Sequence, residues 1–118
     1  MTALNDFASK KCKPCEGGVK PFSPEAARDY VRNLPGWQIS EDGKSISREY
    51  MMKNFRAAVN GINSIAEVAE AEGHHPDLHL TSYRKLKVEL TTHAIGGLSE
   101  NDFILAAKIE ALPKTLKA

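Results

Sequence analysis

The chain has 118 residues, which is room for one domain but not for two of ordinary size. Apolar residues make up 42% of it, and 16 Lys and Arg against 15 Asp and Glu leave a formal charge of +1. This balance excludes the disordered class and gives no global reason to expect a nucleic-acid or acidic-membrane partner. No apolar run reaches the roughly 20 residues of a spanning helix, and Met1 to Lys11 lacks an apolar signal core. We therefore expect a small cytoplasmic protein without a membrane partner.

Residues 1–22 mix Lys, Gly, Pro and Cys without periodicity, and we interpret them as a flexible or loosely docked arm before a single domain at 23–118. The arm contains Cys12 and Cys15, a Cys-x-x-Cys pair. One pair supplies half of a zinc site, and the sequence has no second pair. A redox motif would need a strand before it and a helix after it, and neither is evident. We favour a reduced pair in the arm.

A helix followed by a β-hairpin is predicted at the start of the domain. Ser23 can cap the helix and Pro24 suits its first position, while Pro35 stops it. Two short strands follow at 37–40 and 45–52, with an Asp-Gly turn signal between them. Such a hairpin is marginal by itself, so it must pair or pack with the rest of the chain.

A long helix and a second pair of strands are predicted next. Asn54 can cap the helix, whose apolar residues recur every three or four positions until Gly73 can end it in a left-handed conformation. Apolar and polar residues alternate at 77–83 and 85–92, which is typical of strands with one buried face. A last helix at 99–112 opens on Ser-Glu-Asn-Asp, which resembles a capping box.

The element order is helix, strand, strand, helix, strand, strand, helix. It predicts an α+β domain, in which a four-stranded antiparallel sheet has its helices packed on one face. Four strands leave exposed edges, and small domains often remove such edges by pairing across a dimer. We therefore predict a homodimer or a homotetramer.

Three of the four histidines lie between residues 74 and 79, where a helix ends and a strand begins, and the fourth is His93. Histidine titrates near neutral pH, so this cluster suits general acid–base catalysis. In a hairpin of the last two strands, the residues near His75 and His93 come to the same end of the sheet. We therefore expect His74, His75 and His93 to lie close together, with solvated turn residues as the alternative. Alternation makes His79 a surface residue of its strand.

Zinc is the rival use for three histidines. Pro76 prevents His75 and His79 from sharing one helical turn, and the adjacent side chains of His74 and His75 tend to point apart on an extended backbone. We therefore predict no metal site. Glu70 lies one helical turn before His74, where it could orient an imidazole or simply belong to a solvated helix face.

Three segments in this order are specific to one family. They are Glu-Ala-Glu-Gly-His-His-Pro-Asp at 70–77, Thr-Thr-His at 91–93 and Gly-Leu-Ser-Glu-Asn-Asp at 97–102, with Tyr83 between the first two. Together they resemble the pterin-4a-carbinolamine dehydratases, and the resemblance extends over residues 20 to 112. It implies the same α+β fold and the dehydration of 4a-hydroxytetrahydropterin to quinonoid dihydropterin, with no metal and no bound cofactor. That step follows an aromatic amino-acid hydroxylase, a metabolic neighbour, and allows tetrahydrobiopterin to be recycled.

The resemblance also implies the site residues. The catalytic histidines of the family correspond to His74, His75 and His93, and we expect His74 and His93 to be acid and base while His75 binds and orients. Substrate contacts are expected from the following residues: Glu70, Pro76, Thr92, Ala94, Ile95 and Asp102. A non-catalytic pterin-binding or protein-interaction module on the same fold, like a transcriptional coactivator, is the alternative. Retention of all three histidines favours the enzyme.

Overall fold

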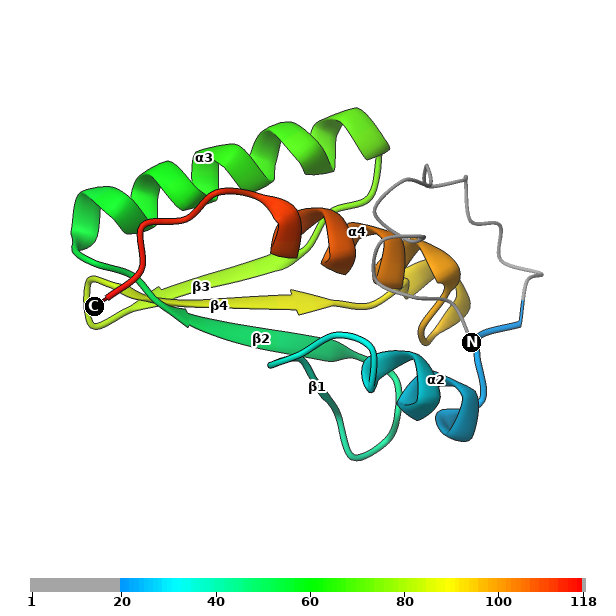
Figure 1. Cartoon of the computed structure of the whole chain (residues 1–118). Coiled ribbons are helices and arrows are strands. Elements are labelled where there is room, and N and C mark those ends of the chain that lie inside the picture. Colours follow the sequence, from blue (N-terminus) through cyan, green and yellow to red (C-terminus); the bar gives the residue numbers. More distant parts are fainter. Residues whose placement is uncertain (1–19, 118) are drawn as a thin grey trace.

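The computed structural model describes residues 20–117, so Cys12, Cys15 and most of the predicted arm lie outside the described residues. The predicted α+β class and element order are confirmed, with a short 3-10 helix in addition (Figure 1). In chain order the elements are α2 (Pro24–Val31), β1 (Gln38–Ile39), β2 (Ile46–Met51), α3 (Phe55–Glu72), β3 (Asp77–Thr81), β4 (Lys85–Leu90), η1 (His93–Ile95) and α4 (Glu100–Ala111). None of the described helices is long and apolar enough to cross a bilayer.

The four strands form one antiparallel sheet in the order β1-β2-β4-β3. β2 and β4 are its centre, paired from Ile46 opposite Leu90 to Met51 opposite Lys85. Because side chains alternate across a strand, Leu86, Val88 and Leu90 are all buried on one face while the residues between them are partly exposed. The sheet therefore has one apolar face for the helices and one polar face.

The helices cover the apolar face. α3 and α4 lie side by side on it (Figure 1), joined across their surfaces by an ion pair 3.7 Å long between Lys108 Nζ and Glu72 Oε2. α2 joins them through the ring of Tyr30, whose centroid lies 5.2 Å from that of Phe103 in α4. Phe22, at the end of the predicted arm, stacks on Tyr30 and donates its backbone N–H to the Leu98 carbonyl. The core thus lies between the sheet and the three helices.

Four helix ends predicted from the sequence are confirmed, whereas α2 ends at Val31, before the Pro35 that was expected to stop it. The side chains of Ser23 and Asn54 accept hydrogen bonds from the first turns of α2 and α3. Gly73 ends α3 with φ 67°, the left-handed conformation that favours glycine. Ser99 and Asp102 form the predicted capping box at the start of α4. These caps fix where the chain enters and leaves the sheet.

The strand ends differ from the prediction. β3 stops at Thr81 rather than at Tyr83, because Ser82 and Tyr83 have φ of 49° and 56° and form the turn into β4. β4 stops at Leu90 rather than at Thr92, because the chain turns there into η1. The apolar alternation itself ends at Leu80 and at Leu90, so both predicted strands were extended past the pattern that defined them.

A partly buried carboxylate joins the end of α4 to the first hairpin. Glu110 Oε1 accepts hydrogen bonds from Trp37 Nε1 at 3.0 Å and from the Tyr50 hydroxyl at 2.5 Å, and it forms an ion pair with Arg48 Nε at 3.3 Å. Burial raises the pKa of Tyr50 well above its ordinary value, and the neighbouring Glu110 carboxylate raises it further. This cluster is structural, and no sequence motif predicted it.

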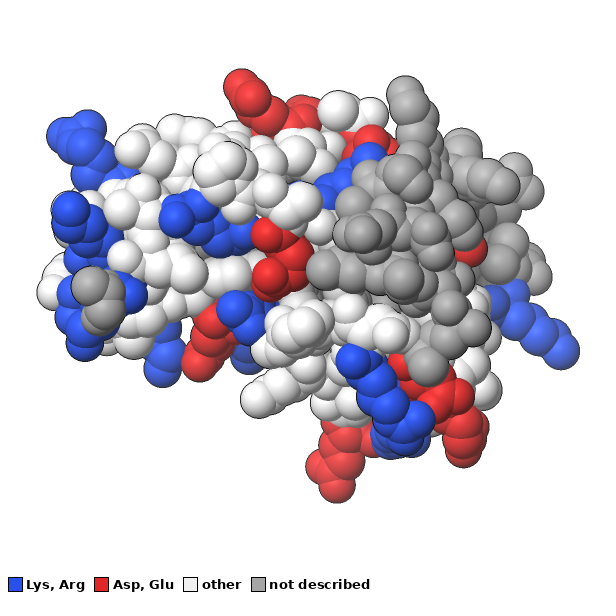
Figure 2. Space-filling model, in the orientation of Figure 1, with Lys and Arg blue, Asp and Glu red and all other residues white. Residues whose placement is uncertain are grey.

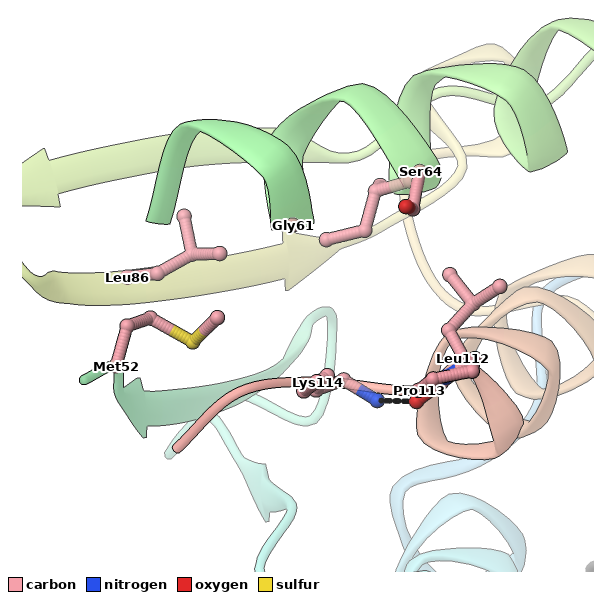
Figure 3. A pocket seen from close by; sticks show the side chains of 8 residues that line it. Met52, Gly61, Ser64, Leu86, Leu112, Pro113 and Lys114 are labelled. Atoms are coloured by element: carbon pink, nitrogen blue, oxygen red, sulfur yellow. Dashed lines mark hydrogen bonds between the residues drawn. The ribbon is translucent and has the colours of Figure 1, made fainter. Parts of the chain in front are cut away.

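A narrow crevice remains between α3 and the segment that follows α4. Gly61 of α3, Met52 and Leu86 line it together with Leu112 and Lys114 (Figure 3). The Lys114 ammonium group donates to the backbone carbonyls at the end of α4, and the partial burial of this group lowers its pKa. The crevice is mostly apolar, and the chain's histidines are not among its lining residues.

Candidate active site

The end of α3 sets the position of His74. Gly73 turns the chain in the left-handed conformation, and the backbone N–H of His74 still donates to the Ala69 carbonyl at 3.3 Å. The His74 side chain is therefore directed back toward α4, where it is only 12% exposed. Its Nε2 lies 2.6 Å from Asp102 Oδ1. Two segments that are 28 positions apart in the chain meet at this hydrogen bond.

Asp102 is fully buried and holds three segments together. Its Oδ2 accepts from the Thr92 hydroxyl at 2.7 Å and from the Ser99 backbone N–H at 2.9 Å. The hydroxyls of Thr92 and Ser99 lie 2.8 Å apart. Because an ionised carboxylate can only accept hydrogen bonds, the contact with Asp102 requires a proton on His74 Nε2 and leaves Nδ1 as the second nitrogen for chemistry.

His75 has a different carboxylate partner. Its Nε2 lies 2.5 Å from Glu70 Oε2, one turn back along α3. Both side chains are largely exposed, 61% for His75 and 76% for Glu70. The two adjacent imidazoles thus have distinct environments: His74 is held by a buried carboxylate and His75 by a solvated one.

His93 opens η1 directly after Thr92. Because the Thr92 hydroxyl and the His74 ring share the Asp102 carboxylate, the backbone of His93 is tethered beside the same centre. The His93 side chain is exposed, as is Ala94, and Ile95 is half-buried. Gly96, with φ 68°, ends this short helix and lets the chain return to pair Gly97 with Thr92.

Of the other histidine-segment residues, Pro76 lies next to the site and His79 lies apart from it. Pro76 follows His75 and is half-buried at the start of β3. His79 lies apart from the cluster on the polar face of the sheet, where its Nε2 is 3.2 Å from Glu89 Oε1. Between residues 20 and 117 no group of three or more His, Cys, Asp or Glu side chains is arranged to hold a metal ion.

One participant was missed by sequence reasoning. Ser99 was predicted only as a helix cap, yet its backbone N–H and its hydroxyl both belong to the network around Asp102. The Ser-x-x-Asp spacing predicted the contact between Ser99 and Asp102 but not the meeting of that cap with Thr92 and His74. Tertiary packing of α4 against the end of β4 brings these groups together.

The arrangement can move protons. A half-buried imidazole backed by a buried carboxylate can accept a proton and be stabilised as the imidazolium, and a second, exposed imidazole is available on the adjacent loop. The arrangement offers general acid–base catalysis to a ligand bound near His74, His75 and η1.

Comparison with known proteins identifies the family of the chain. The family model described as pterin 4 alpha carbinolamine dehydratase matches residues 20–112. A putative pterin-4-alpha-carbinolamine dehydratase from Nitrosospira multiformis is 48% identical over 111 residues, which cover 94% of this chain and 96% of the relative. The mitochondrial pterin-4-alpha-carbinolamine dehydratase 2 of Arabidopsis thaliana is 42% identical, over 93% of this chain and 60% of its own length.

Among solved structures, the crystal structure of a transcriptional coactivator/pterin dehydratase from Brucella melitensis superposes with a TM-score of 0.72 at 29% identity. The superposition covers 78% of this chain and 97% of the Brucella chain. The matched region contains every residue of the histidine and Asp102 cluster. The chain therefore belongs to the pterin 4 alpha carbinolamine dehydratase family.

Proposed function

We propose that this chain dehydrates a 4a-hydroxytetrahydropterin to the quinonoid dihydropterin by acid–base catalysis on histidine side chains. The observation that carries the proposal is the hydrogen bond between His74 and the buried Asp102, next to the Thr92–His93 segment bound to the same carboxylate. Family membership supports the substrate class. The geometry supports the reaction type, because it provides positioned imidazoles.

Loss of water from the carbinolamine is a proton-transfer problem. The bond between the ring carbon and the hydroxyl oxygen breaks, and one proton must reach that oxygen so that it leaves as water. A second proton leaves the neighbouring ring nitrogen, whose electron pair forms the new carbon–nitrogen double bond. No electrons are gained or lost, so the reaction requires an acid and a base but no oxidant. Two imidazoles with different proton affinities can supply both near neutral pH.

His74 and His93 are the proposed pair, with His75 binding and orienting the pterin. Asp102 positions His74 through the hydrogen bond to Nε2, while Glu70 restrains His75. The pterin contact proposed for Thr92 is with its backbone, as the family resemblance implies. The Thr92 hydroxyl is bonded to Asp102 and Ser99, and its N–H already donates to the Gly97 carbonyl, so the Thr92 carbonyl is the acceptor proposed for this contact. Further contacts are proposed from the residues that flank the histidines: Pro76, Ala94 and Ile95.

The wider role follows from the reaction and is part of the proposal. The product of this step can be reduced to tetrahydrobiopterin, so the chain would act after an aromatic amino-acid hydroxylase and support pterin recycling. We place it in the cytoplasm as a homodimer or homotetramer; the Arabidopsis relative is named as mitochondrial. The alternative function is that of a pterin-binding module without turnover. The hydrogen bond between the His74 imidazole and the buried Asp102 carboxylate favours the enzyme.

Stopped-flow measurement of dehydration tests the proposal directly. Chemically generated 4a-carbinolamine is mixed with the protein, and the rate is compared for the parent chain, His74→Ala, His93→Ala and His79→Ala. Loss of a positioned proton-transfer group typically lowers the rate about 10²–10⁴-fold, and we expect this for His74 and His93. His79→Ala is the matched control, since its ring faces Glu89 across the polar face of the sheet.

The outcomes separate the candidate functions. Parent rates in both His74→Ala and His93→Ala contradict the acid–base mechanism. Saturable pterin binding without any acceleration by the parent chain assigns the protein to the binding-module class instead. A large loss of dehydration rate in His79→Ala would place the site on the other face of the sheet. Thermal unfolding of each variant separates loss of chemistry from loss of fold.

A further inference from the structure

The exposed large apolar side chains of the described chain gather at one end of the molecule. They are Met51, Phe55, Tyr83 and Leu116, between 44% and 56% exposed. Backbone bonds show that their segments adjoin: the Lys117 N–H donates to the Met51 carbonyl, and Met52 bridges Leu116. This end, formed by the last residues of β2, the start of α3, the β3–β4 turn and the C-terminal segment, is here called the distal end. It is the opposite end of α3 from His74.

Positive charge is concentrated on the same surface. Figure 2 shows Lys and Arg side chains over the end where Figure 1 places the start of α3, the β3–β4 turn and the C-terminus. The cations on these segments are Lys53, Arg56, Arg84, Lys85 and Lys117. Among the described residues of these segments one carboxylate accompanies them, Glu49, whose Oε2 lies 3.7 Å from Lys85 Nζ. The formal charge of +1 for the whole chain therefore conceals a strongly basic end.

The charges on α3 increase this uneven distribution of charge. Its first turn contains Arg56 and no acidic residue, and its last turn contains Glu70 and Glu72 and no basic residue. This order is opposite to the one that stabilises a helix dipole. The arrangement thus costs helix stability and increases the positive potential at the distal end, which is consistent with selection for something other than folding.

Tyr83 and Arg84 of the distal end are held in place by contacts within the chain. The Arg84 guanidinium lies 5.4 Å from the Tyr83 ring centroid, and Arg84 Nη1 donates to the Lys53 carbonyl at 3.3 Å. About half of each apolar side chain is buried against the domain. Ordered aromatic, methionine and arginine side chains are enriched in protein interfaces and lose little freedom on binding.

A second copy of the same surface is a poor partner. Symmetric pairing of two distal ends would bring the cations of one copy against those of the other, and like charges in contact oppose association. Charge complementarity requires an anionic partner, and the exposed apolar area requires one with apolar side chains as well.

We propose that the distal end is a docking surface for an acidic segment of another protein, in which Asp or Glu residues alternate with large apolar side chains. The apolar side chains of that segment would cover Phe55, Tyr83 and their neighbours, and its carboxylates would pair with the surrounding cations. The surface lies away from the proposed active site, so the inference is independent of the dehydratase activity.

Selection from a random displayed peptide library on the full-length chain tests this proposal. Enriched peptides are expected to combine Asp or Glu with Phe, Trp, Leu or Met. One enriched peptide is then titrated by fluorescence anisotropy against the parent chain, Lys53→Glu, Phe55→Ala and the control Lys44→Glu. Lys44 is an exposed residue of the β1–β2 turn, far from the distal end in the sheet.

We expect Lys53→Glu and Phe55→Ala each to weaken binding about fivefold or more, as for residues that matter in an interface. Lys44→Glu should bind within about twofold of the parent, and added salt should weaken the parent complex. Enrichment without acidic residues, or equal binding by Lys53→Glu and Lys44→Glu, overturns the proposal. So does sedimentation of the chain with phosphatidylglycerol vesicles in the absence of peptide enrichment, which would assign the surface to lipid.

Discussion

Asp102 shows how one residue serves both the fold and the site. Its two oxygens accept from the Ser99 backbone, the Thr92 hydroxyl and the His74 ring. The first contact begins α4, the second fixes the loop before His93, and the third positions the proposed acid–base group. Stability and activity are therefore expected to change together at this position.

Replacement of Asp102 by asparagine tests that coupling. The amide retains the size of the carboxylate but offers only one acceptor oxygen and adds donors, so at least one buried partner loses its bond. We expect a loss of about 1–3 kcal/mol in the free energy of unfolding, measured in urea. The dehydration rate should fall about 10²-fold, because His74 loses its charged partner. The control is Asp29→Asn, an exposed residue of α2; an equal effect at both positions would contradict the role of Asp102.

At the scale of elements, α3 contains a glycine, Gly61, that lies close to the Met52 side chain. A Cβ on Gly61 would lie 3.2 Å from the terminal methyl of Met52 and 3.9 Å from Leu86 Cδ2. The first contact is tight, but the methyl is the end of a flexible side chain beside the crevice between α3 and the C-terminal segment (Figure 3). Met52 has room to move away from an added methyl group.

We therefore predict that Gly61→Ala stabilises the protein. Alanine is favoured over glycine inside a helix by about 1 kcal/mol, and part of this gain survives the adjustment of Met52. The melting temperature, measured by circular dichroism, should rise by a few degrees while the dehydration rate stays near the parent value. A lower melting temperature would show that Met52 cannot adjust and that glycine is needed for its packing.

The junction of β2 and α4 predicts how stability responds to alkaline pH. The folded-state pKa of Tyr50 is raised above its ordinary value of 10.0 by burial and by Glu110. The unfolded chain therefore loses this proton first, and the stabilisation present below about pH 10 decreases as the pH rises beyond it. At neutral pH, Tyr50→Phe should be less stable than the parent, since Glu110 loses a donor. The difference in melting temperature should narrow above about pH 10; a constant difference would contradict the raised pKa.

At the scale of the whole molecule, the sequence predicted the elements well because local signals decided them. Ser23, Asn54, Gly73 and the Ser99–Asp102 pair each determine a helix end through contacts within a few residues. The strand ends were less accurate, because the predicted strands were extended past their last alternating apolar residues, and β3 stops where Ser82 and Tyr83 turn the chain.

Long-range contacts between side chains could not be predicted in the same way. Nothing local marks Glu110 as the common acceptor for Trp37 and Tyr50, which are 73 and 60 positions away. The histidine motif predicted the site residues through a family resemblance, but the bond from His74 to Asp102 depends on how α3 and α4 pack. The concentration of Lys and Arg side chains at the distal end likewise could not be predicted from the net charge of the chain.

The edges of the sheet support the predicted oligomer. β3 is a terminal strand of the sheet, with β4 on one side only. Because an unpaired strand edge favours association, we expect multi-angle light scattering at micromolar concentration to give the mass of a dimer or a tetramer. If this edge is the interface, His79→Pro, near the middle of β3, should shift the measured mass toward that of the monomer. Lys44→Pro, in the other hairpin, is the comparison. A monomeric parent chain would contradict the prediction.

The central claim is that His74 and His93 serve one proton circuit, and a double-mutant cycle on the dehydration rate tests it most directly. The parent chain, His74→Ala, His93→Ala and the double variant are compared by stopped flow, with thermal unfolding as the check on folding. If the two imidazoles act as a unit, the double variant should lose about as much as the worse single variant, roughly 10²–10⁴-fold. A double variant whose loss equals the product of the two single losses would show that the residues act independently, and would contradict the account.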